Sequence, residues 1–346
     1  MSGTEAGGSG GAVDLTARMR ELIVGYFVSR ALYAAAVLDV AGCLAAGPLT
    51  ASQIAQRVGA HGPSLHRLLR ALAAEGVFEE DAEQRFRNTP LSELLRPEVP
   101  GSLRELTLLF GDATSWRSWE AILHSVRTGA GAFEHVFGER FFDYAAQRPE
   151  LAALFDTAMA SASATTHAAV VAAYDFCALR SAVDVAGGIG AALCTILHAA
   201  PALTGIVFDL PHLADRARAF IAEQKLSDRC SFVAGDFFAS MPGGADLYFM
   251  KHILHDWGDE DCVRILRVCR SAMHPGARLL VCERVVPPGN APSSAKLFDL
   301  HMLLTMHGGR ERTLGEYREL LVRAGFDLSR LIPTSTAWSL VEAIPV

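Results

Sequence analysis

Short apolar runs alternate with amphipathic segments along the second half of the chain, from about Ser181 onward. The apolar runs predict buried strands, and the amphipathic segments have the period of a helix. Such alternation is typical of an α/β fold, in which helices cover both faces of a parallel sheet. After a first run that starts at Val183, we expect strands at 204–210, 231–238, 245–250 and 277–281, and helices at 191–200, 213–224, 259–272 and 313–324.

The first half of the chain has a helical period instead. Residues 12–47 are strongly apolar, and such a helix at a chain end is expected to pack against another subunit. Residues 48–96 predict a winged helix, with a capping box at Thr50 and Gln53 and a hairpin at 77–88. Further helices are expected at 115–128, 139–147 and 150–173. The expected domains are a disordered lead-in at 1–11, a winged-helix domain at 12–110, a helical linker at 111–174 and a sheet domain at 175–346.

Composition excludes several classes of function. The net charge of −7 gives no electrostatic reason to expect a nucleic-acid partner. Seven scattered cysteines without a Cys-x-x-Cys pair indicate a reduced, cytoplasmic protein. No apolar run approaches the ~20 residues of a membrane helix, and no signal peptide is evident at the N-terminus.

A winged helix can read DNA, so a transcription regulator is an alternative function. The would-be recognition helix offers only Arg67 and Arg70, with His66, as basic residues. The wing carries acidic residues at 79, 80, 81 and 83, which would repel phosphates. These charges favour a scaffold over a DNA reader.

The strand that starts at Val183 passes into the glycine-rich turn Ala-Gly-Gly-Ile-Gly at 186–190. Glycines at a strand-to-helix turn let the backbone bend and let a ligand approach closely. A dinucleotide site would need a third glycine, where this chain has Leu193. The turn instead resembles that of S-adenosylmethionine-dependent methyltransferases, with Ala186 in place of the first glycine. An alanine there costs little if its φ is negative.

Carboxylates follow the next two strands. Asp209 comes about 20 residues after the turn, where a ribose hydroxyl pair would be held. Asp236 lies beside Phe237, and a carboxylate next to an aromatic ring suits an adenine. Either aspartate could instead cap a turn or helix.

Histidines follow the fourth strand in Lys-His-Ile-Leu-His-Asp-Trp at 251–257. His252, His255 and Asp256 could chelate a metal, although a third strong ligand is not evident. Glu283 ends the fifth strand, and Glu311 lies in a later loop. A carboxylate beside an imidazole orients it and raises its basicity, which suits a general base.

Four motifs in this order resemble the plant-type (caffeate- and carminomycin-like) small-molecule O-methyltransferase family, in its bacterial natural-product branch. They are Asp-Leu-Pro-His at 209–212, Gly-Asp-Phe-Phe at 235–238, the 251–257 motif and Gly-Gly-Arg-Glu-Arg-Thr at 308–313. The resemblance runs from about Ala12 to the C-terminus. It implies a Rossmann-like class I sheet that binds S-adenosylmethionine and an N-terminal winged-helix domain that forms a homodimer. A metal is not expected, because such a cofactor is already cationic, and the composition above gives no reason to expect a nucleic-acid or membrane partner.

The resemblance also assigns roles to residues. His255 resembles the general base, with Glu283 and Glu311 as the carboxylates that bracket it. The cofactor positions are Ala186, Gly188, Asp209, Asp236, Phe237 and Lys251. The acceptor pocket, to which the 111–174 linker contributes, matches Phe155, Met159, Met302 and Met306.

Methyl transfer to a phenolic hydroxyl of an aromatic, natural-product acceptor is therefore the expected reaction. Met306 stands where related plant enzymes often have a polar residue, which favours an apolar, polycyclic acceptor. Two alternatives stay open. Some family members carry out N-methylation or hydroxylation on the same fold, and the DNA-binding regulator is the other.

Overall fold

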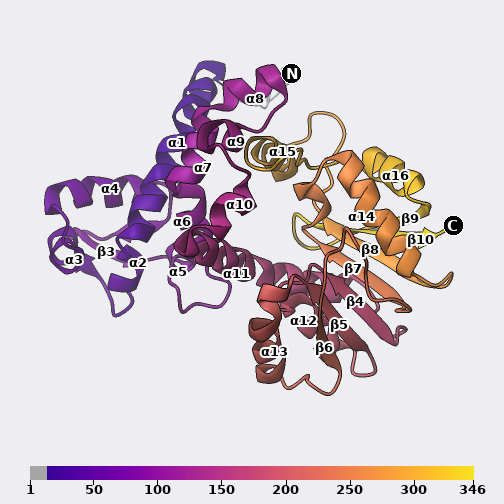
Figure 1. The fold of residues 1–346 in the computed structure, drawn as a ribbon. Helices are drawn as coiled ribbons and strands as arrows, with labels where there is room; N and C mark the ends of the chain where they lie inside the picture. Colours follow the sequence, from indigo (N-terminus) through magenta and orange to yellow (C-terminus); the bar gives the residue numbers. More distant parts are fainter. Residues whose placement is uncertain (1–13) are drawn as a thin grey trace, which may run out of the picture. The chain divides into compact units, whose positions relative to one another are not determined.

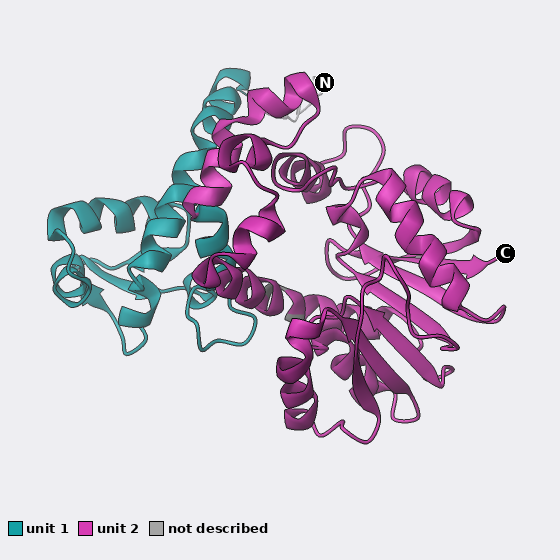
Figure 2. Ribbon diagram, viewed as in Figure 1, with its two compact units in different colours: residues 1–111 teal, residues 112–346 magenta. Residues whose placement is uncertain are grey.

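The structure is a computed structural model that describes residues 14–346. The predicted lead-in at 1–11 lies outside the described residues. The chain forms two compact units, residues 1–111 and 112–346, which Figure 2 colours separately. Within the described part, no helix combines the length and the apolar character needed to cross a bilayer.

The first unit begins with helix α1 (Leu15–Val37), whose start is fixed by Asp14. The Asp14 carboxylate accepts hydrogen bonds from the N–H groups of Thr16 and Ala17, which would otherwise lack partners. The single helix expected over 12–47 is wrong, because Asp39 adopts a left-handed conformation (φ 50°) and ends it. A short helix α2 (Val40–Cys43) follows.

A winged helix completes the first unit. The Thr50–Gln53 capping box starts α3 (Ala51–Val58), and Pro63 lies in the first turn of α4 (Gly62–Ala74). A small antiparallel sheet, in the order β1-β3-β2, packs with these helices around Ile54, Leu69 and Phe86. The remaining elements are β1 (Leu49–Thr50), β2 (Phe78–Glu80), β3 (Arg85–Asn88), α5 (Pro90–Glu93) and α6 (Arg104–Gly111).

Helices also begin the second unit, and they are more fragmented than the sequence predicts. The helix expected over 115–128 is divided at Ala121, whose backbone leaves the helical region. The helix expected over 139–147 is shorter, and another helix precedes it that ends at Phe137 and is capped by Gly138. The observed helices are α7 (Ala113–Glu120), α8 (Ile122–Thr128), α9 (Ala132–Phe137), α10 (Phe141–Ala146) and α11 (Pro149–Ala173).

A seven-stranded sheet in the order β6-β5-β4-β7-β8-β10-β9 forms the core of the second unit (Figure 1). The five predicted strands are present and pair in parallel. They are β4 (Ser181–Val185), β5 (Thr204–Asp209), β6 (Cys230–Ala234), β7 (Leu247–Lys251) and β8 (Arg278–Glu283). The predicted Rossmann-like parallel sheet is therefore confirmed, and β9 (Phe326–Pro333) and β10 (Ser339–Pro345) add antiparallel strands beside β8.

Helices cover both faces of this sheet. On one face, α14 (Asp259–Ala272) and α16 (Leu314–Arg323) pack against Tyr248, Val281 and their neighbours. On the other face, α12 (Ala191–Ala199), α13 (Ala214–Glu223) and the end of α11 pack against Val207 and Phe249. The remaining elements are the 3-10 turns η1 (Pro211–Leu213) and η2 (Leu254–Asp256) and the helix α15 (Ser294–Thr305). The strands β4, β5, β7 and β8 run parallel, so their carboxyl ends lie along the same side of the sheet. The glycine turn, Asp209, Lys251 and Glu283 therefore lie at this carboxyl-terminal edge.

Candidate active site

The glycine-rich turn connects β4 to α12 through left-handed conformations. Ala186, Gly188 and Gly190 have φ values of 53°, 61° and 87°. The condition under which an alanine costs little, a negative φ, is therefore not met at Ala186, and the side chain there carries a strain that glycine would not. A Cβ atom on Gly188 would meet nothing within 4 Å, so the turn has an open side where a ligand can approach the backbone.

The Asp209 carboxylate ties the end of β5 to this turn. Its Oδ2 accepts a hydrogen bond from the Gly188 N–H at 2.7 Å, and its Oδ1 accepts one from the Leu210 N–H at 2.7 Å. Asp236 is exposed and caps its own turn by accepting from the Phe238 N–H. Phe237 is half-buried against Trp257, with ring centroids 5.9 Å apart. These residues lie along the same edge of the sheet, after β5 and β6.

Polar groups are buried around Lys251 at the end of β7. The Lys251 ammonium donates a hydrogen bond to the Ser163 hydroxyl at 3.0 Å. Asp184 lies in the neighbouring strand, and its Oδ2 is buried without a hydrogen-bond partner among the described residues. Burial raises the pKa of Asp184 to about 7, although the charge of Lys251 opposes that shift. Burial likewise lowers the pKa of His167 to about 3, and its Nε2 is also unpartnered within the described chain.

Such unpartnered buried atoms need an explanation, since nearly all buried polar atoms in proteins are hydrogen-bonded. A polar ligand between the glycine turn and Lys251 would supply the missing partners. The amino and carboxyl groups of S-adenosylmethionine have the required chemistry, so the residues at this edge fit the cofactor that the sequence resemblance implies.

His255 lies in the η2 turn between two completely buried carboxylates. Its Nδ1 atom is 3.2 Å from Glu311 Oε1 and 3.5 Å from Glu283 Oε2. The other ring nitrogen, Nε2, is 3.6 Å from Asp256 Oδ1. The ring itself is only 12% exposed. Both glutamates therefore lie on the Nδ1 side of the ring, and Asp256 is the carboxylate nearest to Nε2.

The charges of this cluster set its proton affinities. Burial lowers the pKa of His255, but the negative charges of Glu283, Asp256 and Glu311 outweigh it and raise that pKa to about 10. Burial raises the pKa of Glu283 to about 7 against the opposing charge of His255. Burial also raises the pKa of Asp256 to about 6. The cluster therefore stabilises a proton on the imidazole.

Residues that the sequence analysis did not single out hold this cluster in place. Arg312 is completely buried and donates hydrogen bonds to the carbonyl oxygens of Leu254 and Trp257, at 2.8 Å each, on either side of His255. Asp299 in α15 accepts a hydrogen bond from the Glu311 N–H at 3.0 Å. In the sequence, the only sign of this support is the pair of arginines, at 310 and 312, on either side of Glu311.

The metal alternative considered for His252, His255 and Asp256 finds no support in the geometry of the described residues. The two imidazole rings are 5.8 Å apart, and His252 stacks on Trp338 at 3.5 Å between ring centroids. A different group, His255 with Glu283 and Glu311, has donor atoms within 4.8 Å of one another, a spacing at which a cation could be held. Glu283 Oε1, however, already accepts hydrogen bonds from the N–H groups of Ile253 and Leu254.

Apolar side chains predicted to face the acceptor form a cluster beside this site. Met302 and Met306 pack with Phe133 and Phe141, and Phe155 is partly buried against them. Met159, one turn further along α11, is half-buried and lies outside this cluster. The structure therefore brings three of the four predicted acceptor residues together.

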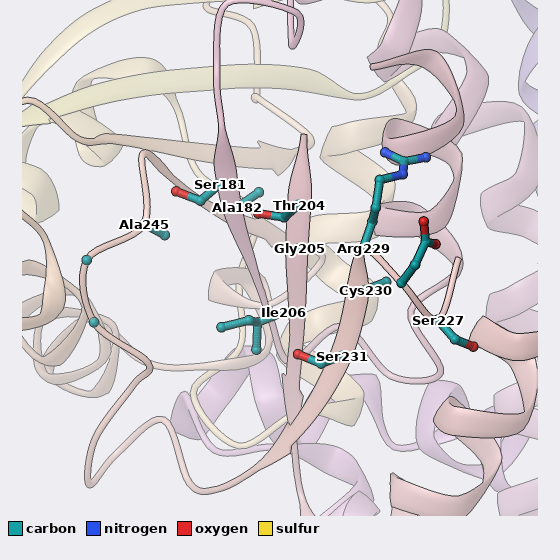
Figure 3. A pocket seen from close by; sticks show the side chains of 13 residues that line it. Ser181, Ala182, Thr204, Gly205, Ile206, Ser227, Arg229, Cys230, Ser231 and Ala245 are labelled. Atoms are coloured by element: carbon teal, nitrogen blue, oxygen red, sulfur yellow. The ribbon is translucent and has the colours of Figure 1, made fainter. Parts of the chain in front are cut away.

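A separate hollow of about 330 Å³ lies at the amino ends of β4, β5 and β6, at the opposite end of the strands from His255 (Figure 3). Two of its polar side chains already have partners within the protein. The Arg229 guanidinium donates to the last carbonyls of α12 and the following loop, and the Ser181 hydroxyl accepts from the Asp246 N–H. This hollow carries no catalytic cluster.

Replacing Ala186 by glycine is expected to stabilise the protein, because glycine adopts a positive φ without strain. The left-handed conformation costs an alanine about 1–2 kcal/mol, so Ala186→Gly should raise the free energy of unfolding by up to that amount in denaturant titrations. The matched variant Gly188→Ala places a Cβ atom in open space but at a φ of 61°, so its free energy of unfolding should fall by a similar amount. An unchanged or lowered stability of Ala186→Gly would contradict the assigned strain.

Comparison with known proteins places these observations in a family. An O-methyltransferase dimerisation domain matches residues 20–97, and an O-methyltransferase domain matches residues 119–327. The chain is 41% identical to the phenazine O-methyltransferase PhzM of Lysobacter antibioticus, over 97% of this chain and 98% of the relative. It is 35% identical to the 8-amino-8-demethylriboflavin N,N-dimethyltransferase of Streptomyces davaonensis, over 94% of each chain.

Among solved structures, one neighbour is the O-methyltransferase NcsB1 from neocarzinostatin biosynthesis, in complex with S-adenosylmethionine and 2-hydroxy-5-methyl naphthoic acid. Its TM-score is 0.77 at 36% identity, and the match covers 92% of this chain and 96% of that one. With a glycine turn open to a ligand, a mostly parallel sheet and two matching family domains, the chain belongs to the S-adenosylmethionine-dependent O-methyltransferase family, in the branch of bacterial natural-product enzymes.

Proposed function

We propose that this enzyme transfers a methyl group to a phenolic hydroxyl of an aromatic acceptor, with His255 as the general base. The observation that carries the proposal is the position of the His255 imidazole between the buried carboxylates of Glu283 and Glu311. Both carboxylates act on Nδ1, which fixes the proton of the neutral ring there and leaves the lone pair of Nε2 for the acceptor. Bound S-adenosylmethionine supplies an electrophilic methyl group on a sulfonium sulfur.

Proton affinities support a phenolic acceptor. A phenol has a pKa of about 10, so at neutral pH its proton must be removed as the oxygen attacks. The neighbouring carboxylates raise the pKa of His255 against the effect of burial, which makes the neutral ring a stronger base. Glu283 and Glu311 then stabilise the imidazolium that forms when the hydroxyl proton moves to Nε2.

Cofactor binding is assigned to the edge of the sheet beside this cluster. Asp209 and the Gly188 backbone would hold the ribose, and Asp236 with Phe237 would hold the adenine. Lys251 and the buried polar atoms near it would hold the amino-acid end. The positive φ of Ala186 is part of the backbone shape of this turn, which would contact the cofactor.

An aromatic acceptor agrees with the apolar cluster of Met302, Met306 and Phe155. Three relatives are named after aromatic acids that they methylate. These are 3-amino-4-hydroxybenzoate, 2,7-dihydroxy-5-methyl-1-naphthoate and, for an N-methyltransferase, phenazine-1-carboxylate. The proposal for this chain is therefore a phenol on an aromatic ring system, in natural-product biosynthesis.

N-methylation is the second candidate, because two relatives at 35% and 31% identity are N-methyltransferases. An aromatic amine attacks through a neutral nitrogen lone pair and has no need of a strong base before attack. The two reactions therefore make different demands on His255.

His255→Ala tests the proposal. We expect kcat for phenolic acceptors to fall by roughly 10²- to 10⁴-fold, because general-base help of this kind is lost. The affinity for S-adenosylhomocysteine, measured by calorimetry, should stay unchanged. His198→Ala, at an exposed position on α12, is the matched control. Full activity of His255→Ala on phenols would refute the base, and activity confined to amines would favour N-methylation.

The pH dependence of kcat/KM should shift when Glu311 loses its charge. The imidazole must be neutral to accept a proton, so activity rises with pH on the acidic limb of the profile. Glu311→Gln removes a negative charge 3.2 Å from Nδ1 and thus lowers the pKa of His255. The acidic limb should move to lower pH by roughly 1–3 units, with a reduced kcat at its plateau. Glu319→Gln, on the exposed side of α16, should not move it.

Homodimer formation is proposed through the first half of α1. Residues 15–27 are exposed on every side in the single chain, and the helix carries a stripe of large apolar side chains. The stripe consists of Leu15, Met19, Leu22, Ile23, Tyr26 and Phe27. An isolated helical segment of this kind is marginal in water, so it needs a covering partner. The family dimerisation domain begins to match at residue 20.

An acidic substitution in this stripe should convert the dimer into monomers. Leu22 is 60% exposed, and Leu22→Asp places a charge where the partner would bury it. Light scattering after size exclusion should show the mass fall by half. Ala17→Asp, on the opposite side of α1 and in its first turn, should leave the mass unchanged. A monomeric wild type would contradict the proposal.

A further inference from the structure

The residue after Glu283 has an arrangement that the proposed chemistry does not use. Glu283 ends β8 with its carboxylate toward His255, and Arg284 turns toward different neighbours. The Arg284 guanidinium carbon lies 3.7 Å from the ring centroid of Phe298 in α15 and 4.2 Å from that of Trp338. Contacts of a guanidinium with two aromatic faces hold its plane in a fixed orientation.

Two of the three nitrogen atoms of this guanidinium lack hydrogen-bond acceptors among the described residues. Nε and Nη1 of Arg284 are shielded from solvent and have no hydrogen-bond partner within residues 14–346. Burial lowers the pKa of Arg284, but the charges of Glu311 and Glu283 oppose that shift, and an arginine stays charged at neutral pH. Buried, charged donors without acceptors are costly and rare, so the arrangement is that of a site prepared for a ligand.

We infer that Arg284 binds a carboxylate on the acceptor, on the same ring system as the hydroxyl that is methylated. Resting on the proposed function, the inference adds the class of acceptor, an aromatic hydroxy acid. Trp338 links the two groups, because its ring centroid is 6.2 Å from that of His255 and 4.2 Å from the Arg284 guanidinium carbon. His255 and Arg284 therefore share Trp338 as a neighbour, so an aromatic acceptor that packs on this ring would lie near both groups.

A carboxylate suits the surroundings better than other oxygen ligands. A neutral carbonyl would bring no charge to the guanidinium, whereas a carboxylate forms charge-assisted hydrogen bonds with it and accepts several of its N–H groups in one plane. A phosphate would bring about two negative charges close to Glu283 and Glu311, which repel it. The neighbouring His301 stays neutral near pH 7, because burial lowers its pKa to about 4.

The cofactor also has a carboxylate, and the position of Arg284 argues for the acceptor instead. The proposed cofactor residues follow β4, β5, β6 and β7. Arg284 contacts Phe298 of α15, the helix that also carries Met302 of the apolar acceptor cluster. The guanidinium thus belongs to the acceptor side of the site.

Binding measurements on the full chain loaded with S-adenosylhomocysteine test the inference independently of methyl transfer. The probes are a hydroxynaphthoic acid and its primary amide, which differ only in the anionic group. Wild type should bind the acid at least about tenfold more tightly than the amide, as expected for a charge-assisted hydrogen bond. Arg284→Met should weaken acid binding to the level of the amide and leave amide binding unchanged. Arg284→Lys, which keeps the charge without the planar fork, should retain part of the preference.

Arg318→Met, an exposed arginine of α16, is the matched control and should behave as wild type. The inference is overturned if wild type binds no aromatic acid, or if Arg284→Met or Arg284→Lys keeps the full preference for the acid. It is also overturned if Arg284→Met weakens S-adenosylhomocysteine binding instead, since the guanidinium would then serve the cofactor carboxylate. A wild type that binds the acids but transfers no methyl group would contradict the proposed function alone.

Discussion

The structure around the active site depends on the burial of two carboxylates against one imidazole. Glu283 and Glu311 are completely buried, and each buried charge carries a desolvation penalty of several kcal/mol unless it is paired. Two backbone N–H groups of the η2 turn bind Glu283, and the His255 ring lies between both glutamates. The same contacts that repay the desolvation also fix the orientation and proton affinity of the ring. Stability and chemistry therefore rest on one set of atoms here.

Local sequence patterns predicted most of the second unit. The parallel strands β4 to β8 are mostly short apolar runs, so the hydrophobicity of the sequence predicted their positions. Their parallel direction then predicted that Lys251 and Glu283 lie at the same carboxyl-terminal edge of the sheet. The antiparallel strands β9 and β10 were not predicted. β9 is an edge strand that mixes exposed and half-buried residues, so its pattern gives little strand signal. The helix breaks at Asp39 and Ala121 were also missed. Each break is a change of backbone dihedral angles at one residue, and it does not alter the pattern of apolar and polar residues along the chain.

The candidate site was predicted less from pattern than from resemblance. His255 and Glu311 are far apart along the chain, and no local rule brings them together; the motifs of the family suggested that they meet. Their roles stay a prediction. Arg312 and Asp299 were missed because they act on backbone atoms, through hydrogen bonds that impose no spacing on the sequence. Arg284 was missed because an unpartnered donor can be recognised only when its neighbours in space are known.

The chain order of Glu283, α15 and Glu311 has a consequence for how such enzymes can diversify. Helix α15 with its flanking loops forms an interval between the two glutamates that contact the His255 ring, Glu283 before it and Glu311 after it. Asp299 ties this helix to the second glutamate through its hydrogen bond with the Glu311 N–H. Under the proposed function, exchange of Phe298, Met302 and the adjoining Met306 would change the acceptor that is bound while the proposed base and its two carboxylates stay in place.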